Sequence, residues 1–537
     1  MARLRVPALV VVAAVAIGFL MGSLMSGQVQ ASSALTSKLH VFNEILTYAD
    51  KFYVEEVDAV ELVEGAIAGL LEELDPHSTY VRPKDYEQMT ERNTGEYEGI
   101  GISFEIREGW ITVITAIEGG PSAHLGIRPG DRIVGIEGES AKDLVSEEVI
   151  AKLKGPKGTD VDITVERPGA NNTFDLTIRR DRIPIYSVPY HFMLDDETGY
   201  IRATRFSATT SEELEAALRD LESQGMQKLV FDLRNNSGGY LNQAIEVSDR
   251  FIKGDEVIVY TKGRIKGSSQ YYYSSNGVTR SKFPLICLVN HGSASASEIV
   301  SGAIQDHDRG LVIGQTTFGK GLVQRQYSLR DGSALLLTVA RYYTPSGRLI
   351  QRSYEDRDEY LEYFRRLNDG DIDESEIEAR PEFKTLNEER TVYGGGGITP
   401  DILVEDVYDP NEIQTKLEQL RVFFEFANDY AARNLDKATL VQRDFVTNFE
   451  LPEAGFKEFK KFIKDVEGAE ELTQEDIENE REYIKLGVKR ELAGNLWGLN
   501  ARYQVFVQED PQLQKALTHF NEAENMARLY AKVGIDE

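Results

Sequence analysis

One serine and one lysine of this chain stand in surroundings that suit covalent catalysis. Ser295 lies in the run HGSASASE at residues 291–298, where small residues surround its hydroxyl, and Lys320 follows 25 positions later between two glycines. A serine hydroxyl is a weak nucleophile until a neighbouring base takes its proton, and a desolvated lysine can act as that base. The pair therefore predicts acyl transfer, with Ser295 as nucleophile and Lys320 as general base.

The position of Ser295 also predicts an oxyanion hole. The serine follows an apolar run that is typical of a buried strand, and it precedes a predicted helix at residues 298–306. Backbone N–H groups at a helix start have no partner within the helix, so the N–H of Ala296 is the first candidate donor. A second donor is expected from Gly238 or Gly239, at the end of the run DLRNNSGG, because no side chain blocks approach there.

Two structural interpretations compete at Ser295. Ser295 and Glu298 have the spacing of a capping box, in which the serine hydroxyl would only bond the helix backbone. Ser293 and Ser297 are further hydroxyls in the same run, so the sequence leaves open which of them matters.

Lys320 is followed by a residue that can position its amine. Phe318, Leu322 and Val323 supply apolar surroundings, and burial without a carboxylate partner lowers the pKa of a lysine. Gln324 is expected to hold the amine by a hydrogen bond, whether the segment is a helix or a strand. The alternatives are an ordinary solvated lysine and a surface glutamine.

A separate glycine loop predicts a peptide-binding module. The run YEGIGISF contains Gly99, Ile100, Gly101 and Ile102 immediately before a predicted strand. Such a loop can offer consecutive N–H groups to a terminal carboxylate, and the strand can pair with an extended peptide. The glycine-rich segment 120–131, followed by the apolar residues 133–136, strengthens this interpretation.

Taken together, these motifs resemble the C-terminal processing peptidases, or tail-specific proteases, a serine–lysine family with a PDZ domain. The match runs from about residue 74 to residue 404, with anchors at 74–80, 95–131, 232–239, 293–306, 314–324 and 397–401. The resemblance implies that Ser295 is the nucleophile, Lys320 the base and Gln324 its positioning residue. It also implies an oxyanion hole from Ala296 with Gly238 or Gly239, and a PDZ carboxylate loop at Gly99, Ile100, Gly101 and Ile102.

The resemblance further implies that unfolded or nonpolar C-termini are the substrates and that the PDZ domain gates the active site. One departure is Ser237, which stands where family members often have proline. We also expect an adaptor or lipoprotein activator, and a homodimer, to be possible partners. The alternatives are a catalytically silent PDZ scaffold and a Ser–His hydrolase that uses His291 or His307.

Strands and helices alternate through the middle of the chain, which predicts an α/β core. We expect a multidomain α/β protein: a signal peptide or membrane anchor at 1–31, an N-terminal helical segment at 32–94, a PDZ-like domain at 95–180, a mixed α/β serine–lysine peptidase core at 181–407 and a helical domain at 408–537. The helical domain is assigned to structure or dimerisation. Within the core, residues 356–389 are expected to form an exposed excursion, and 393–397 a flexible joint before a strand at 398–404.

Composition and the N-terminus bound the location and chemistry. Arg3 and Arg5 precede a long apolar run, so a cleaved signal and an uncleaved inner-membrane anchor both fit, and both predict a periplasmic or extracytoplasmic protein. The net charge of −29 argues against nucleic acid as a partner. The scattered histidines predict no metal site, no cofactor is expected, and Cys287 is expected to be a buried strand thiol.

Overall fold

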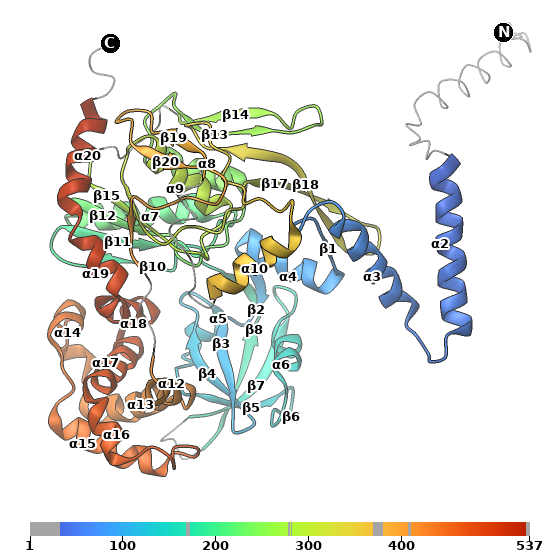
Figure 1. Cartoon of the computed structure of the whole chain (residues 1–537). Helices are drawn as coiled ribbons and strands as arrows, with labels where there is room; N and C mark the ends of the chain where they lie inside the picture. The colour runs from blue at the N-terminus through green and yellow to red at the C-terminus, as the bar shows by residue number, and fades with distance from the viewer. Residues whose placement is uncertain are drawn as a thin grey trace, which may run out of the picture. The chain divides into compact units, whose positions relative to one another are not determined.

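The chain forms two compact units, residues 1–80 and residues 81–537 (Figure 1). The computed structural model describes residues 33–167, 172–275, 277, 280, 282–368, 380–405 and 410–532. The first unit holds helices α2 (Ser33–Phe52) and α3 (Ala59–Glu72) and the start of strand β1 (Thr79–Val81). The predicted signal or anchor lies outside the described residues. No helix within the described ranges is long and apolar enough to cross a membrane.

A six-stranded sheet forms the centre of the second unit. Its order is β10-β11-β12-β15-β16-β21, and every neighbouring pair is parallel except β10 with β11. The strands are β10 (Tyr190–Met193), β11 (Thr198–Arg202), β12 (Lys228–Asp232), β15 (Leu285–Val289), β16 (Leu311–Gly314) and β21 (Ile402–Leu403). The apolar runs at residues 228–232 and 285–289 thus form the adjacent strands β12 and β15, which confirms the predicted α/β core.

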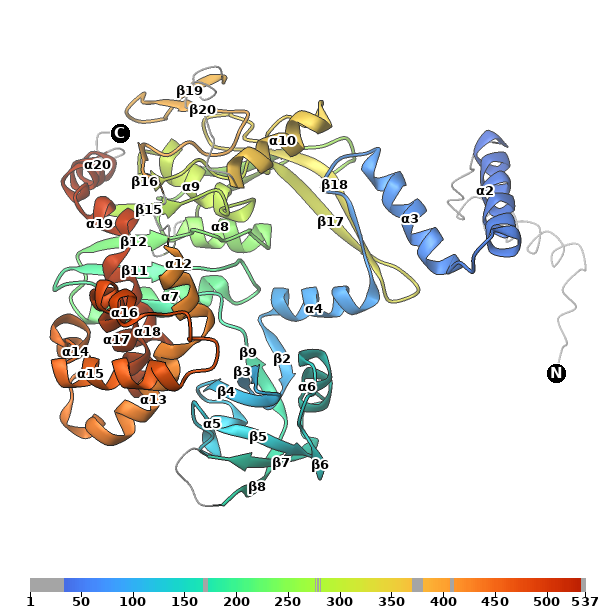
Figure 2. The same ribbon diagram turned by 60° about the horizontal axis from the view of Figure 1, so that its bottom comes forward.

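Alternate residues of these strands enter two different cores, because side chains of a strand point to opposite faces. Helices α7 (Thr210–Ser223), α8 (Leu241–Asp249) and α9 (Ala296–Asp306) cover one face, which we call the front. Helices α19 (Pro511–Leu517) and α20 (Phe520–Lys532) cover the other face, the back. Figure 2 shows these two layers on opposite sides of the strands. Both faces are therefore buried, which explains why the strands are apolar throughout.

The PDZ-like module is a separate sheet with its own core. Its strands are β3 (Ile102–Arg107), β4 (Trp110–Ala116), β5 (Arg132–Ile136), β6 (Glu139–Ser140), β7 (Asp160–Glu166) and β8 (Phe174–Arg179), with helices α5 (Pro121–His124) and α6 (Ser146–Leu153). Strand β2 (Glu96–Gly99) pairs with β9 (Asp181–Pro184), so the two chain segments that enter and leave the module lie side by side. Helix α4 (Pro83–Thr94) precedes β2 and lies in the second unit.

A long antiparallel hairpin, β17 (Leu322–Ser328) with β18 (Ala334–Tyr343), carries the residues after Lys320. Strand β13 (Val257–Lys262) pairs with both β18 and β14 (Gln270–Tyr273). The hairpin places Gln324 on a strand rather than on a helix.

The segment predicted as an exposed excursion is partly packed. It contains helix α10 (Arg357–Asn368) and strand β19 (Glu382–Lys384), which pairs with β20 (Thr391–Tyr393). Tyr360 and Tyr363 are buried, and the Arg352 guanidinium carbon lies 3.4 Å from the centre of the Tyr363 ring. The prediction of a fully exposed excursion was therefore wrong, because its aromatic residues pack in a segment that is otherwise charged.

The glycine run before β21 is not a flexible joint. Gly395 and Gly397 donate their N–H groups to the carbonyls of Leu349 and Ile350, at 2.7 and 2.8 Å. Gly397 has φ +91°, and a Cβ there would lie 2.4 Å from the Thr317 carbonyl oxygen. The glycines allow this segment to pack closely against the backbone of neighbouring segments. The strand that follows is shorter than predicted and covers Ile402–Leu403.

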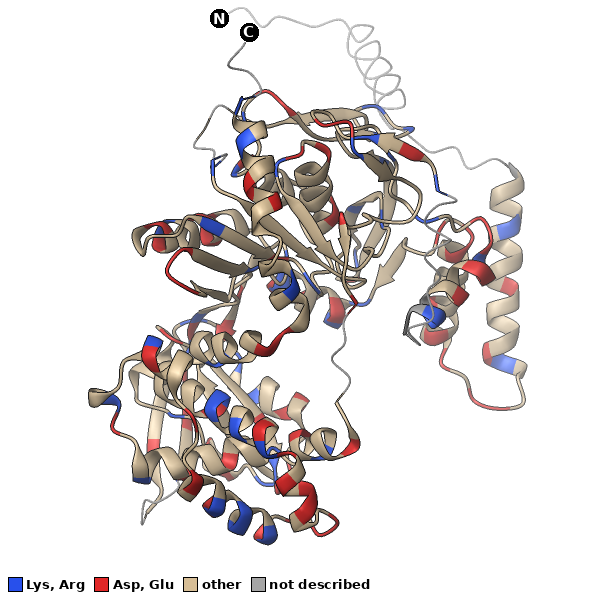
Figure 3. Ribbon diagram, turned by 60° about the vertical axis from the view of Figure 1, so that its left-hand side comes forward, with Lys and Arg blue, Asp and Glu red and all other residues tan. Residues whose placement is uncertain are grey.

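The C-terminal region is helical, as predicted, and does two different things. Helices α12 (Glu412–Gln419), α13 (Val422–Asn434), α14 (Gln442–Asn448), α15 (Glu453–Phe462), α16 (Gln474–Asn479), α17 (Arg481–Trp497) and α18 (Leu499–Phe506) share a core of their own. The last helices, α19 and α20, instead complete the back of the peptidase sheet. Figure 3 shows acidic and basic residues interleaved along the helices of this region.

Candidate active site

Ser295 stands at the junction between β15 and α9, at the carboxyl end of a central parallel strand. This edge is where α/β sheets place their sites. The three serines of the run differ sharply in their bonding. Ser293 donates to the Leu233 carbonyl at 2.8 Å, and Ser297 donates to the Asn236 carbonyl at 2.7 Å; both are fully buried. Ser295 is half-buried, and its hydroxyl caps no helix N–H. Of the three hydroxyls, that of Ser295 is therefore the one available for chemistry.

The backbone of Ser295 is strained. Its φ of 54° and ψ of −108° lie outside the regions that residues with a side chain normally occupy. Such conformations cost about 1–3 kcal/mol each and persist only where the surroundings impose them. Residues 295 and 298 keep the predicted capping-box arrangement at the start of α9, in which Glu298 accepts the N–H of Ser295.

Glu298 bonds the Ser295 N–H in the capping box and also bonds the lysine loop. Its fully buried carboxylate accepts the N–H of Ser295 at 2.7 Å, that of Gly319 at 2.7 Å and that of Lys320 at 3.0 Å. It also accepts the Thr317 hydroxyl at 2.6 Å. Burial raises the pKa of this carboxyl, while the four hydrogen bonds oppose the shift. One side chain thus binds the backbone of both predicted catalytic residues.

Tyr342 of β18 links the same two residues from the carbonyl side. Its buried hydroxyl lies 3.0 Å from the Ser295 carbonyl oxygen and 2.7 Å from the Lys320 carbonyl oxygen. Burial, and then the nearby Glu298, raise the pKa of Tyr342, so the phenol remains a donor. Glu298 and Tyr342 together fix the spacing between the serine loop and the lysine loop.

The amine of Lys320 is hydrogen-bonded to Gln324, as the sequence predicts. The distance from Lys320 Nζ to Gln324 Oε1 is 2.7 Å, and both residues are half-buried. Gly319 and Gly321 are pressed against other segments: a Cβ at Gly321 would lie 2.8 Å from the backbone nitrogen of Gln351. The two glycines therefore let the lysine loop pack closely against the segment that follows β18.

The glycine turn after β12 lies directly against Ser295. A Cβ at Gly238 would be 2.9 Å from both the Ser295 Cβ and the Ala296 nitrogen, and its φ is +99°. The Ala296 N–H has no acceptor within the described part of the chain. The Gly238 N–H donates to the Asn236 side chain at 3.0 Å, whereas that of Gly239 makes no hydrogen bond within the same residues. Ala296 and Gly238 therefore lie beside the serine, whereas the near neighbours of Gly239 belong to Phe206.

Asparagines join the two loops. The Asn236 carbonyl accepts the N–H of Ala294 at 2.9 Å. Asn235 donates its N–H to the Asn290 side chain at 2.8 Å, and the Asn290 amide donates to Asn235 Oδ1 at 3.0 Å. These bonds hold the glycine turn and the serine loop in one register.

An ion pair lies beneath this edge of the sheet. The Asp232 carboxylate is fully buried and accepts from the Arg234 guanidinium and from Tyr200. Burial alone would raise the pKa of Asp232, but the charge and hydrogen bonds of Arg234 outweigh it and lower that pKa. Arg234 also bonds Asp510 and Gln512 of the C-terminal region.

Neither histidine of the alternative hydrolase forms a hydrogen bond with Ser295 among the described residues. His291 Nδ1 lies 2.7 Å from the Thr316 carbonyl oxygen, and burial lowers the pKa of His291. His307 follows the last residue of α9, at the opposite end of that helix, and its Nε2 lies 2.7 Å from the Val257 carbonyl oxygen. Cys287 is fully buried in β15, as predicted, and burial raises the pKa of its thiol.

The predicted peptide-binding loop lies between β2 and β3. Gly101 has φ +76°, and the Ile100 carbonyl accepts the N–H and hydroxyl of Ser122, which fixes the turn. The N–H groups of Ile100 and Gly101 make no hydrogen bond within the described part of the chain. A groove of about 450 Å³ runs from this loop between β3 and α6, lined by Tyr97, Ile100, Gly101, Ile102, Ser103, Phe104, Ser146, Ile150, Leu153 and Lys154.

The two residues that join the serine loop to the lysine loop, Glu298 and Tyr342, were not identified as such from the sequence. Glu298 was recognised only as a capping residue, although its place three positions after Ser295 was a usable signal. Nothing around Tyr342 in the sequence indicates its role, because it reaches the site from a strand whose neighbours are set by the fold.

Comparisons with known proteins agree with this architecture. Residues 197–359 match the model of peptidase family S41, residues 112–167 that of the PDZ domain, and residues 22–84 that of the activating protease CtpB N-terminal domain. The chain is 38% identical to a carboxy-terminal-processing protease of Bartonella bacilliformis, over 62% of this chain and 78% of that protein. It is 37% identical to the carboxy-terminal processing protease CtpA of Bacillus subtilis, over 61% of this chain and 69% of that protein. Among solved structures, the photosystem II D1 C-terminal processing protease is 26% identical and matches 70% of this chain and 95% of its own, with a TM-score of 0.34.

Proposed function

Because this chain belongs to the carboxy-terminal processing proteases of peptidase family S41, we propose that it cleaves protein substrates by a serine–lysine acyl-enzyme mechanism. The observation that carries the proposal is the double link between the two loops: Glu298 and Tyr342 each bond the backbone of both Ser295 and Lys320. Such an arrangement holds a nucleophile and its base in a fixed relation, which general-base catalysis requires.

In the proposed reaction, the neutral Lys320 amine takes the proton of Ser295 while the serine oxygen attacks the scissile carbonyl. The negatively charged oxygen that forms accepts a hydrogen bond from the Ala296 N–H and a second one from a glycine N–H. The second donor is Gly239, or Gly238 once its N–H has broken its bond with the Asn236 side chain. Lys320 then gives its proton to the departing amine, which leaves an acyl-enzyme. A water molecule, deprotonated by Lys320, hydrolyses that ester and regenerates the serine. Gln324 keeps the amine directed toward Ser295 throughout.

We propose that the PDZ-like groove selects the substrate. The N–H groups of Ile100 and Gly101 can bind a terminal carboxylate, and the tail adds as a strand beside β3. The apolar lining favours a nonpolar final side chain. An amidated tail should therefore be degraded more slowly than the same tail with a free carboxylate.

We further propose that the protein acts outside the cytoplasm, after export by its N-terminal residues. The arginines and apolar run there are the basis of this proposal. An adaptor or lipoprotein activator, inner-membrane anchoring and homodimerisation stay predictions of the sequence alone.

The direct test follows degradation of an unfolded protein with a nonpolar C-terminus by the purified full chain. We expect Ser295→Ala to lower kcat by a factor on the order of 10³ or more, since the attacking group is lost. Ser301→Ala is the matched control: it removes a serine hydroxyl from the same helix, where it bonds only the Ser297 carbonyl, and should keep near-normal activity. Equal activity of Ser295→Ala and the control would contradict the proposed nucleophile.

A further inference from the structure

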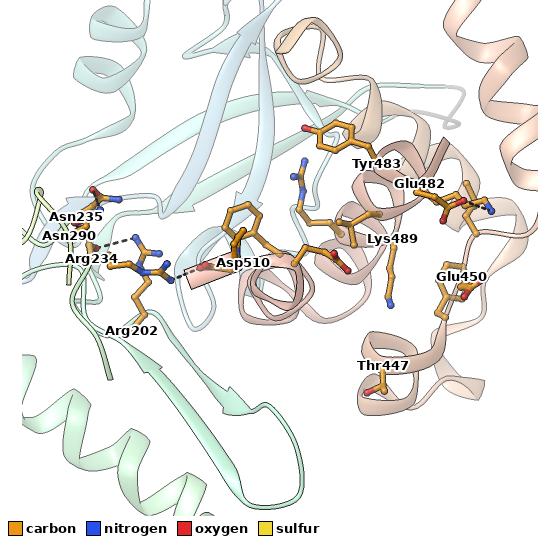
Figure 4. A pocket seen from close by; sticks show the side chains of 18 residues that line it. Arg202, Arg234, Asn235, Asn290, Thr447, Glu450, Glu482, Tyr483, Lys489 and Asp510 are labelled. Carbon is orange, nitrogen blue, oxygen red and sulfur yellow. Dashed lines mark hydrogen bonds and ion pairs between the residues drawn. The ribbon is translucent and has the colours of Figure 1, made fainter. Parts of the chain in front are cut away.

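A second cavity of about 620 Å³ lies between the C-terminal helices and the carboxyl edge of the central sheet (Figure 4). Arg202, Arg234, Asn235 and Asn290 line it on the sheet side, and residues of α17 and of the loops around α14 and α18 line the rest. The carboxyl edge of a parallel sheet is where α/β proteins bind ligands. The mechanism proposed above makes no use of this cavity.

Lys489 of α17 is the unusual residue in its wall. The residue is only 9% exposed, and its amine makes no hydrogen bond and no ion pair with any described residue. In Figure 4 its side chain extends into the cavity, between the two arginines on one side and Glu450 on the other. Burial lowers the pKa of Lys489, while the charges of Glu450 and Glu509 oppose that shift.

Three of the other cations around the cavity are paired with carboxylates. Arg234 bonds Asp232 and Asp510, Arg490 bonds Glu418 and Glu491, and Lys485 pairs with Glu453 and Glu482. Arg202 stacks on Tyr503 and bonds its hydroxyl. Lys489 and Arg202 are therefore the cations of this wall that form no ion pair with a described residue, and of the two only Lys489 lacks a hydrogen bond as well.

The remaining wall is apolar and its rim is acidic. Phe449, Leu451, Leu486 and Phe506 line the cavity, and Glu450, Glu482 and Glu509 are exposed at it. The three carboxylates at the rim would repel a dianion such as phosphate more strongly than a ligand with a single negative charge, so Lys489 suits a singly charged ligand. The apolar wall suits a ligand with a hydrophobic body attached to that charge.

We propose that this cavity is a second ligand site, which binds a carboxylate carrying an apolar body, with the carboxylate paired to Lys489. The source of that chemistry is either the end of a peptide or a free aliphatic acid. The site goes beyond the proposed peptidase function and stands apart from the PDZ-like groove. It lies against Asn235 and Asn290, the pair that joins the serine loop to the glycine turn.

The test measures binding by calorimetry on the full chain carrying Ser295→Ala, so that binding is read independently of turnover. The probe is N-acetyl-leucine, which is too short to add as a strand beside β3. We expect it to bind, and N-acetyl-leucinamide, which has the same shape without the charge, to bind at least about 10-fold more weakly, because a charge-assisted hydrogen bond is lost. Octanoate binding more tightly than N-acetyl-leucine would identify free aliphatic acids as the source; the reverse order would identify peptide ends.

Lys489→Met locates the site, because it keeps the side-chain length and removes the charge. We expect it to raise the dissociation constant of N-acetyl-leucine at least about 10-fold. Lys485→Met is the matched control on the same helix and cavity wall, and its ion-paired lysine should change binding by less than about twofold. Equal binding by Lys489→Met and the control, equal binding of acid and amide, tighter binding of inorganic phosphate, or no binding of either carboxylate at millimolar concentration would each overturn the proposal.

Discussion

The two faces of the central sheet are covered by parts of the chain that differ in sequence distance and in chemistry. The front is covered by α7, α8 and α9, which alternate with the strands themselves. The back is covered by α19 and α20, which follow β16 by about two hundred residues. The proposed catalytic groups gather at the carboxyl edge of the sheet beside α9, whereas the back has an apolar core with the buried ion pair of Asp232 and Arg234 at its edge.

The difference indicates that the two faces of the sheet have different roles: the front positions the serine and lysine loops, and the back contributes hydrophobic burial. At the front, the backbone of Ser295 is strained. Glu298 and Tyr342 fix the loops that carry Ser295 and Lys320 by hydrogen bonds to the backbone of both. Arg234 connects the sheet to the helices of the back, because it bonds Asp232 at the end of β12 and also Asp510 and Gln512 at the start of α19.

Breaking that connection should have the largest effect on stability. Arg234→Met leaves Asp232 buried without its ion-pair partner, and we expect the free energy of unfolding to fall by roughly 3–5 kcal/mol. Urea unfolding followed by circular dichroism measures it. Arg219→Met is the matched control, since its ion pair with Glu215 is exposed on the Arg219 side and should contribute less than about 1 kcal/mol.

The same pair predicts a dependence on pH. In the folded wild type the pKa of Asp232 lies below its unfolded value of about 3.9, so its stabilisation is complete above that pH and is lost as the pH falls through the folded pKa. In Arg234→Met the strongest opposition to burial is removed, and only the charge of Arg202 and the hydrogen bond of Tyr200 still oppose it, so this pKa rises. The stability difference between the two proteins should be largest at neutral pH and should narrow as the pH is lowered toward 4. A difference that widens with acid would contradict the assignment.

The back should be as tightly packed as the front. Leu513 of α19 and Leu218 of α7 are both fully buried, one in each core. We expect Leu513→Ala and Leu218→Ala each to lower the free energy of unfolding by about 2–5 kcal/mol, by lost burial and by the cavity left behind. If Leu513→Ala costs less than about 1 kcal/mol while Leu218→Ala costs the full amount, the C-terminal helices are only loosely docked.

Glu298 acts as a polar clamp, since its carboxylate bonds the backbone of both the serine loop and the lysine loop. Loss of this clamp should lower kcat more than it weakens substrate binding. Glu298→Ala leaves the N–H groups of Ser295, Gly319 and Lys320 without their acceptor, so the two loops can separate. We expect kcat to fall by roughly 100-fold with KM little changed, because small misplacements of reacting groups have effects of that size. Steady-state kinetics on the unfolded substrate measures it, and Ser301→Ala again controls for a change within α9. A fall in kcat no larger than that of the control would show that the clamp does not position the dyad.

Local patterns in the sequence were enough to predict the front and its site. Each of these features depends on a few adjacent residues. They are the apolar runs that form β12 and β15, the serine loop, and the Lys320–Gln324 pair. The back could not be predicted in this way. Residues 511–532 have an ordinary amphipathic pattern, and nothing in them states that their partners are Tyr200, Val230 and Ile286. Long-range packing of this kind depends on the completed fold.

The glycines at 394–397 show the opposite failure. A run of glycine typically predicts flexibility, but here the lack of side chains lets the backbone approach Thr317 and Leu349 closely. Sequence shows that such positions are permissive, and only the structure shows which property of glycine is used. The same holds for Glu298, whose capping role was predictable and whose contact with the lysine loop was not.

The most direct test of the central claim is the activity of Lys320→Met on the unfolded substrate, together with its thermal unfolding midpoint. Methionine keeps the length and apolar contacts of the lysine but cannot accept a proton. The account predicts that kcat falls by a factor on the order of 10³ or more while the unfolding midpoint stays near that of the wild type. Near-normal kcat in a folded Lys320→Met protein would contradict the assignment of Lys320 as the base that activates Ser295.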